Sequence, residues 1–391
     1  MKTITDVSVR TLLRTALVVG AGAFLVGCGG DDDKDNAAPA AKSTDAAAKT
    51  ADAPAGSAGF DEVKKLSATL LERPTEIGVT EPVGQEIPSG KNLVWISCGV
   101  PACQTLGKTF TEGAKELGWT VKVINTDGTP EKIKAAWTQV ARDTPDAVAS
   151  SGVDLSLIGA QLKQLKGADV PVALFAVPEK ADGVTVLVGD AKGEAEAFGE
   201  PMAAFIVSDS GGDANTMLVN LPNFPILNDL EKGFKDVYEK GCADCAYERM
   251  DLPLSSLGKD VPARIVSALR AKPDVNYVAM AVDDLTAGLP AALRAAGLAD
   301  RVKIVGATSG PTNYQYITAD QQAAGVPNAF YEDTWLMVDG LARVFVGEDP
   351  SVSEITPPRM IVTKDNLPST DAVFPLVEDF REQFLTLWGK N

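Results

Sequence analysis

The sequence predicts an α/β protein made of two doubly wound parallel-sheet lobes. Its 391 residues are 45% hydrophobic and 23% charged, which is ordinary globular composition in a chain long enough for two cores. Near-continuous runs of Val, Ile and Ala alternate with segments of helical period, as in parallel sheets covered on both faces. The alternation falls into two consecutive sets, and each set is long enough for one lobe.

The first set alternates strand and helix from residue 91 onward. Thr129 precedes Pro130, so we predict an N-cap followed by a first helical residue. The predicted strands are residues 91–99, 120–125, 146–150, 170–177 and 184–189, and the helices are 102–119, one opening at Thr129, 154–166 and 194–207.

The second set repeats this rhythm. Its predicted strands are residues 216–221, 246–252, 275–282, 302–307 and 323–327, and its helices are 226–240, 261–272, 286–296, a short one near Tyr314, and 332–346. Because ligands of such sheets bind beyond the carboxyl ends of the strands, two facing lobes predict a ligand cleft between them.

Charge and composition exclude several function classes. The chain has 53 acidic and 36 basic residues, so we expect it to repel nucleic-acid phosphates and to have no nucleic-acid partner. It has no histidine, which removes Ser-His-Asp and Cys-His nucleophile systems, HExxH metalloproteases and His-ligated zinc. It also lacks a GxxxxGK[ST] loop and a clustered acid pair, so we expect no enzyme activity, no cofactor and no metal.

The first 27 residues predict a signal peptide. A basic start precedes a short apolar run, residues 15–27, whereas a membrane-spanning helix needs about 20 apolar residues. The run ends in LVGC, which resembles the lipobox of bacterial lipoproteins, where the cysteine is acylated and becomes the new N-terminus. We therefore expect residues 1–27 to be removed and Cys28 to carry lipid. A plain secretory signal with a chance cysteine is the alternative.

Two further segments precede the lobes. Residues 28–59 hold almost nothing large to bury, which predicts a disordered tether that spans roughly 30 Å as a flexible coil. A spacer without a tuned length is the alternative. Residues 60–90 are an N-terminal extension that begins with a helix. We expect lobe 1 to comprise residues 91–190 and 327–356, lobe 2 residues 191–326, and a C-terminal crossover and helix residues 357–391.

Four segments resemble the successive blocks of type I periplasmic solute-binding proteins, in the ribose-binding-like branch of the sugar ABC transporter substrate-binding family. They are KNLVWISCGVPAC, NLPNFPILNDLEKGF, YVAMAVDDLTAGLPAALRAAG and VKIVGATSG, and the similarity covers about residues 91–350. PPRMIVTKDNL and DAVFPLVEDFREQFLTLWG resemble the tail of that branch. Residues 60–90 resemble an extension of its actinobacterial lipoprotein members. Transcriptional repressors share the lobe pair, but they carry a helix-turn-helix where this chain has a lipobox.

The resemblance implies an extracytoplasmic protein, anchored by lipid to the outer face of the cell membrane. Such a protein closes around a small organic ligand and delivers it to the permease of an ABC importer. We expect a monomer in which contacts from both lobes stabilise the closed state. The resemblance also implies a three-crossing hinge between the lobes, with crossings near Asp190, Val326 and Pro357. A ligand-binding sensor for a membrane receptor is the alternative that the sequence leaves open.

Candidate ligand-binding residues stand where the predicted strands end. They are Ser151, Phe175, Asn220, Phe224, Asp283, Thr308 and Asn328. In the family that the chain resembles, the aspartate matching Asp283 accepts hydrogen bonds from ligand hydroxyls, but Asp283 could instead cap the following helix. Asn328 matches an amide that touches ligand there, with a hinge or turn role as the alternative. The two phenylalanines could stack on a ligand or belong to the core, and the other three could serve turns or caps.

The charged groups that grip sugars in ribose-type binders are missing. Their Asp-Arg pair after the fourth strand corresponds to Phe175-Ala176-Val177, a second arginine would fall near Asn228, and an aspartate would fall near Thr308. This departure puts a free pentose in doubt. It favours a sugar-like ligand that is less polar, or a ligand that contains an aromatic ring.

The four cysteines after Cys28 form two local pairs, Cys98 with Cys103 and Cys242 with Cys245. Outside the cytoplasm, such pairs are more often structural disulfides than metal or redox sites. Cys242-Ala-Asp-Cys245 lies before a predicted strand, not at a helix start that would stabilise a reactive thiolate. We therefore predict two disulfides, with a four-cysteine metal site as the alternative.

Overall fold

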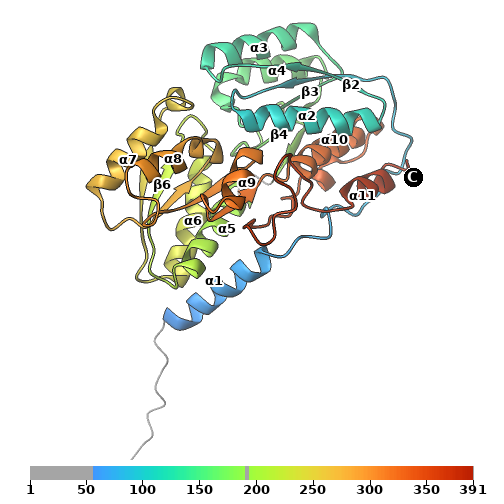
Figure 1. Ribbon diagram of the computed structural model, residues 1–391. Helices are drawn as coiled ribbons and strands as arrows, with labels where there is room; N and C mark the ends of the chain where they lie inside the picture. Colours follow the sequence, from blue (N-terminus) through green and yellow to red (C-terminus); the bar gives the residue numbers. More distant parts are fainter. Residues whose placement is uncertain (1–55, 190–192, 391) are drawn as a thin grey trace, which may run out of the picture. The chain divides into compact units, whose positions relative to one another are not determined.

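The chain forms two five-stranded parallel sheets (Figure 1). A computed structural model describes residues 56–189 and 193–390. The first sheet has the strand order β2-β1-β3-β4-β5 and the second β10-β9-β8-β6-β7. Neighbouring strands pair in parallel throughout both sheets. The prediction of two doubly wound α/β lobes is therefore confirmed, and we call the part built on the first sheet lobe 1 and the part built on the second lobe 2.

Lobe 1 alternates strands and helices along the chain. Its elements are β1 (Asn92–Ile96), α2 (Pro101–Glu116), β2 (Thr120–Ile124), α3 (Pro130–Asp143), β3 (Ala147–Ser151), η1 (Leu155–Leu157), α4 (Gly159–Gly167), β4 (Val172–Phe175) and β5 (Val186–Val188). All residues of β3, β4 and β5 are buried, which explains their unbroken apolar runs. Edge strand β2 has no buried residue, in keeping with its pairing on one side alone.

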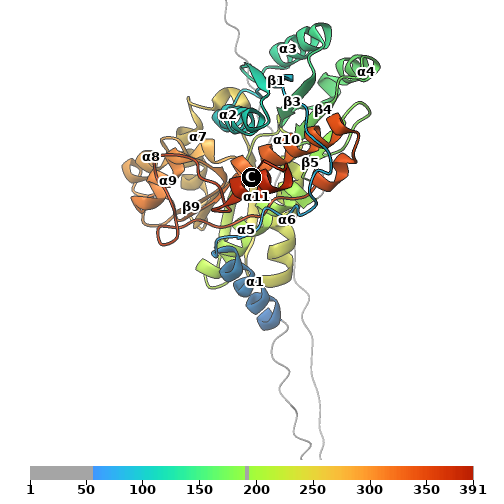
Figure 2. The ribbon, with the colours of Figure 1, turned by 90° about the vertical axis from the view of Figure 1, so that its right-hand side faces the viewer.

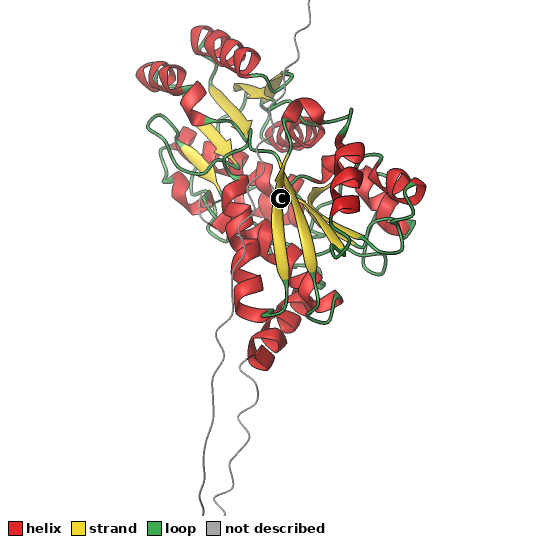
Figure 3. Ribbon diagram, turned by 90° about the vertical axis from the view of Figure 1, so that its left-hand side faces the viewer, coloured by secondary structure: helices red, strands yellow, loops and turns green. Residues whose placement is uncertain are grey.

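Lobe 2 repeats the pattern. Its elements are α5 (Gly193–Asp209), β6 (Asn215–Asn220), α6 (Leu227–Gly241), β7 (Ala246–Asp251), η2 (Leu254–Ser256), α7 (Val261–Ala271), β8 (Tyr277–Met280), η3 (Asp283–Thr286), α8 (Leu289–Ala295), β9 (Lys303–Ser309), α9 (Pro311–Thr318) and β10 (Ala324–Pro327). Figure 3 shows its strands in yellow with helices beside them in red. The lobe has one continuous apolar core, in which β6 and β8 pack against helices α5, α6 and α7.

Some predicted boundaries differ from the structure for local reasons. The predicted helix 286–296 begins only at Leu289, because η3 occupies Asp283–Thr286 and Gly288 then adopts a left-handed backbone with φ of +79°. Thr129 stands at the N-cap of α3, but its hydroxyl donates to Asp127 Oδ1 at 2.7 Å and does not cap the helix.

After β10 the chain passes between the lobes at three described places. After β10 it enters α10 (Phe330–Val346), which packs on α2 of lobe 1. Beyond η4 (Pro350–Ser353) it returns to lobe 2, where Val362 and Gly325 exchange backbone hydrogen bonds of 2.8 and 2.9 Å. Finally α11 (Phe380–Leu387) rejoins the core of lobe 1. The first two passages lie at the crossings predicted near Val326 and Pro357, and the third, between Val362 and α11, was not predicted. The crossing predicted near Asp190 lies outside the described residues.

The N-terminal extension packs on both lobes. Helix α1 (Gly56–Leu70) lies against α5 and α6, with Val63 in the apolar core of lobe 2 (Figure 2). Further along the extension, Ile77 and Ile87 are buried in the core of lobe 1. The extension thus adds a connection between the lobes beyond the predicted crossings.

Helix α1 starts inside the segment predicted as tether. Gly59 lies so close to α6 that a Cβ on it would stand 2.0 Å from the Lys240 carbonyl oxygen, so a glycine is needed there. The predicted signal peptide, Cys28 and the rest of the tether lie outside the described residues. Among the described helices, none is both long enough and apolar enough to cross a membrane.

Candidate ligand-binding cavity

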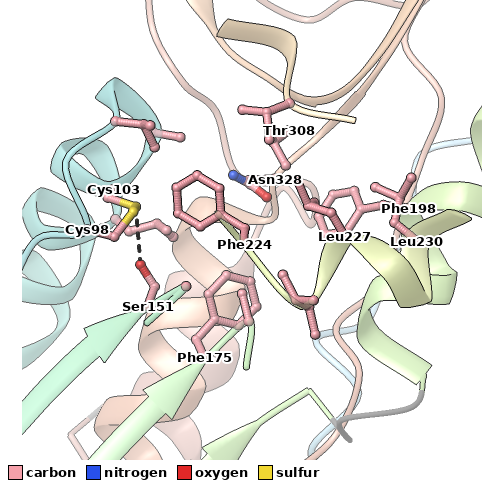
Figure 4. Close-up of a pocket in the computed structure, with 17 residues that line it drawn as sticks. Cys98, Cys103, Ser151, Phe175, Phe198, Phe224, Leu227, Leu230, Thr308 and Asn328 are labelled. Atoms are coloured by element: carbon pink, nitrogen blue, oxygen red, sulfur yellow. Dashed lines mark hydrogen bonds between the residues drawn. A yellow bond between two sulfur atoms is a disulfide. The ribbon is translucent and has the colours of Figure 1, made fainter. Parts of the chain in front are cut away.

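A cavity opens between the two lobes at the carboxyl ends of their strands (Figure 4). Its volume is about 90 Å³, and the figure rises to about 650 Å³ when the gaps between atoms and the open solvent at its mouth are included. Lobe 1 contributes Cys98, Val100, Ala102, Cys103, Leu106, Ser151, Gly152, Phe175 and Ala176, lobe 2 contributes Phe198, Phe224, Ile226, Leu227, Leu230, Val282 and Thr308, and the passage after β10 contributes Asn328. Both lobes therefore build the walls.

Strand register places the lining residues side by side. Ser151 ends β3 and pairs with Phe175, which ends β4. Thr308 lies at the end of β9, and Asn328 directly follows β10, the neighbouring strand. Because parallel strands end at the same edge of a sheet, residues distant in sequence meet there.

Five of the seven predicted ligand-binding residues line this cavity. They are Ser151, Phe175, Phe224, Thr308 and Asn328. The structure brings them together from both lobes, whereas Asp283 and Asn220 lie outside the lining.

Asp283 lies outside this lining, and its carboxylate is fully buried in lobe 2. The carboxylate accepts hydrogen bonds from Ser309 Oγ at 2.5 Å, Thr286 Oγ1 at 2.6 Å and Gln322 Nε2 at 2.7 Å. It packs against Gly306 of β9, where a Cβ would come within 2.1 Å of the carboxylate. Burial raises the pKa of Asp283 to about 6, and the three hydrogen bonds oppose that rise. Asp283 therefore links η3 to β9 and to the turn before β10.

Asn220 also lies outside this lining, and its Oδ1 is buried without a hydrogen-bond partner. Its Nδ2 donates to Asp251 Oδ1 at 3.0 Å, and the same oxygen accepts from Arg249 Nε at 2.6 Å. Asn220 therefore ties the end of β6 to the end of β7, its partner strand. An asparagine at a strand end carries no sequence signal that distinguishes this role from ligand contact.

Three polar side chains remain in the cavity wall. Thr308 Oγ1 is buried without a hydrogen-bond partner, and Thr308 has a left-handed backbone with φ of +63°. Asn328 is 4% exposed, and its amide makes no side-chain hydrogen bond to any residue that the structure describes, although its oxygen and nitrogen are not fully enclosed as Thr308 Oγ1 is. Ser151 Oγ donates to Cys103 Sγ at 3.5 Å. Because a buried polar group without a partner is costly, Thr308 and Asn328 are the groups best placed to bond a ligand.

The described lining residues carry no formal charge. Two charged groups lie near this wall without joining it. The guanidinium carbon of Arg359 lies 4.4 Å from the ring centre of Phe198. Asp284 of lobe 2 meets the start of α2 in lobe 1. Burial raises its pKa to about 6, and a hydrogen bond from the backbone N–H of Ala102 opposes that rise.

Disulfides join the two cysteine pairs. Cys98 and Cys103 have Cα atoms 5.7 Å apart, and both line the cavity. Cys242 and Cys245 have Cα atoms 5.2 Å apart and lie just after α6. Among the described residues, no group of His, Cys, Asp and Glu side chains could hold a metal ion.

Sequence reasoning missed the apolar wall. Leu106 of α2, Phe198 of α5, and Leu227 and Leu230 of α6 all line the cavity. Their helical spacing predicts a buried face, and periodicity alone cannot distinguish a face that packs on a core from one that faces a cavity.

The fold and this cavity are those of a two-lobed solute-binding protein. A model of the family described as periplasmic binding protein domain matches residues 93–349, which is more than half of the chain. The chain therefore belongs to this family of extracytoplasmic proteins, which bind substrates and are not enzymes. A search of curated proteins finds no match to the chain.

Solved structures of the same fold come from several bacteria. An ABC sugar transporter subunit from Rhodobacter sphaeroides 2.4.1 has a TM-score of 0.61 and 18% identity, covering 71% of this chain and 99% of that chain. A 5-methylthioribose transporter solute-binding protein from Thermotoga lettingae, in complex with 5-methylthioribose, has a TM-score of 0.63 and 17% identity. The match covers 78% of this chain and 95% of that chain. A periplasmic ribose ABC transporter protein from Conexibacter woesei has a TM-score of 0.60 and 18% identity. The match covers 72% of this chain and 95% of that chain. The likeness is one of fold.

Proposed function

We propose that this protein is a lipid-anchored, extracytoplasmic solute-binding protein that delivers a small organic ligand to the permease of an ABC importer. The observation that carries the proposal is the cavity, because its wall comes from both lobes. Phe175 of lobe 1 and Phe224 of lobe 2 contribute to the same space. A ligand that touches both lobes binds the closed arrangement better than the open one, so it shifts the population toward closure.

The anchor is the second part of the proposal. The short apolar run and LVGC motif at the N-terminus support acylation of Cys28. A lipid there would hold the two lobes near the outer face of the membrane, where a permease can receive the ligand. We expect a monomer, because one chain supplies both walls of the cavity.

The similar proteins named above are described as transporter components, which favours transport over the alternative of a sensor for a membrane receptor. The solved structure with bound 5-methylthioribose makes a sugar-like small molecule a reasonable reference ligand. A less polar or aromatic relative of a sugar also fits the proposal, because the family's charged sugar-gripping groups are missing at Ala176 and Asn228.

The test is mass spectrometry of small molecules released from protein purified from native cells. We expect one organic species in near-equimolar amount, together with a lipid mass on the N-terminal peptide that begins at Cys28. Reconstitution with the ABC permease encoded next to this protein's gene should show ligand-dependent ATP hydrolysis. If no small molecule is retained and the apo protein is not stabilised by compounds from the growth medium, the proposal is wrong.

A further inference from the structure

We infer that the cavity takes an uncharged ligand whose larger part is apolar or aromatic and whose polar end bonds Thr308 and Asn328. The inference rests on the proposed function, since it assumes that this cavity is the ligand site. It narrows the ligand from small organic molecules in general to one chemical class.

The first argument is charge. None of the described lining residues is charged, and the buried Asp283 carboxylate is already engaged by three donors in lobe 2. A charged ligand would lose its water without gaining a partner of opposite sign among these residues, which strongly disfavours binding.

The second argument is the number of hydrogen-bonding groups. Only Ser151, Thr308 and Asn328 offer polar side chains among the described lining residues. The Ser151 hydroxyl is in contact with Cys103 Sγ. A free pentose has several hydroxyls, and most of them would face apolar walls and lose hydrogen bonds that water provides. A ligand with one polar end has few hydrogen-bonding groups, and Thr308 and Asn328 can bond them, so it loses few of the hydrogen bonds that water provides.

The third argument is the state of the aromatic rings. Trp335 in the core of lobe 1 packs against the rings of Phe380, Phe384 and Trp388. Phe175 and Phe224, by contrast, contact no other aromatic ring among the described residues, and Figure 4 shows both rings at the cavity. Each ring is largely buried in the core of its own lobe, and the part that borders the cavity offers an apolar surface to a ligand.

The fourth argument locates the polar end. Thr308 Oγ1 is buried and unpartnered, and its residue is held at a positive φ that a β-branched side chain rarely adopts. Such backbone strain is typical of binding sites. Asn328 follows the neighbouring strand β10, and its amide can both donate and accept. A hydroxyl, amide or carbonyl group of the ligand satisfies this pair.

The experiment compares three probes by titration calorimetry on the full-length exported protein after bound small molecules are removed. Indole-3-acetamide is uncharged and aromatic with one polar end, indole-3-acetate has nearly the same shape with a carboxylate, and D-ribose is polar throughout. We expect indole-3-acetamide to bind at least about tenfold more tightly than the other two, because neither a carboxylate nor a set of hydroxyls finds partners in this wall.

Two variants locate the probe in the cavity. Thr308→Val removes the unpartnered hydroxyl and should weaken indole-3-acetamide binding about five- to tenfold. Phe224→Leu removes a ring face and should weaken it about threefold to tenfold. Thr144→Val is the matched control, because Thr144 also has a positive φ, of +43°, but is exposed at the end of α3. It should leave the affinity unchanged.

The outcomes separate this inference from the proposed function. The inference would be overturned, and the proposed function left standing, if D-ribose or indole-3-acetate bound more tightly than indole-3-acetamide and the Thr308→Val variant bound that probe less tightly. If no probe binds, the molecule that co-purifies from native cells decides. An uncharged, mainly apolar molecule supports the inference, and a polyol or an ion overturns it. Absence of any co-purified molecule would overturn both.

Discussion

Arg359 and Asp333 form an ion pair that is buried on both sides. Arg359 Nη1 lies 3.3 Å from Asp333 Oδ1, and the two side chains are 3% and 0% exposed. Asp333 belongs to α10 on lobe 1, whereas Arg359 follows the passage back to lobe 2 and stacks on Phe198 of the cavity wall. Burial lowers the pKa of Arg359 to about 9 and raises that of Asp333 well above its usual value. The pair therefore connects a hinge passage to the ligand cavity.

Replacing Arg359 should be strongly destabilising. Arg359→Met would leave the Asp333 carboxylate buried without this partner, which typically costs about 3–5 kcal/mol of unfolding free energy. Urea denaturation measures the loss. Arg381→Met is the control, because Arg381 pairs with Glu116 at 2.9 Å on the surface, with side chains 48% and 29% exposed. A surface pair contributes about 0–1 kcal/mol, so equal losses in the two variants would contradict the assigned role.

The buried Asp283 should make the protein less stable as pH rises. Its pKa is about 6 in the folded protein against 3.8 for the ordinary group, so the folded state holds this proton more tightly than the unfolded state. The contribution is therefore fully present below about pH 4 and is lost as pH rises through about 6, a change on the order of 2–3 kcal/mol. Urea unfolding at several pH values measures it. Asp283→Asn should flatten that part of the profile, and an unchanged profile would refute the assignment.

The Cys98–Cys103 disulfide should matter for ligand binding, and the Cys242–Cys245 disulfide should not. Each bond closes a short loop, so removing either pair with serines should cost about 2 kcal/mol of stability. Only Cys98 and Cys103 line the cavity, so only their double variant should also weaken binding of the co-purified molecule. A thiol assay on the native protein should find no free thiol from these four cysteines. Equal affinities in the two double variants would show that the cavity wall does not depend on the disulfide.

Lipid anchoring depends on one sulfur atom in the proposed processing scheme. Cys28→Ala removes it, and the apolar run before residue 28 is shorter than the ~20 residues that span a membrane. The variant should appear in the soluble fraction or as unprocessed precursor when cells are fractionated. Wild-type protein in the membrane fraction is the control, and a Cys28→Ala protein that still carries a lipid mass would disprove the scheme.

The sequence alone determined the two lobes and the place of the cavity. Apolar runs and helical spacing are local patterns, and the ends of parallel strands meet at one edge, so the positions of Ser151, Phe175 and Thr308 at strand ends were enough to assign them to the cavity. Phe224 was likewise a candidate by its position after a strand, and Asn328 followed from the resemblance to a known family. The apolar helix faces with Phe198 and Leu230 could not be assigned, because a stripe that faces a cavity has the same spacing as one that packs on a core.

Only the tertiary structure decided the roles of Asp283 and Asn220. A carboxylate after a strand can bond either a ligand or a neighbouring element of the fold. Which of the two it bonds depends on side chains that lie far along the chain. Ser309 of β9 and Gln322 of the turn before β10 donate hydrogen bonds to Asp283. Gly306 has no side chain, and this leaves room for the Asp283 carboxylate in the core of lobe 2. Hydrogen-bond partners brought together by sheet pairing leave no local pattern in the sequence, and they determine which polar groups remain free to meet a ligand.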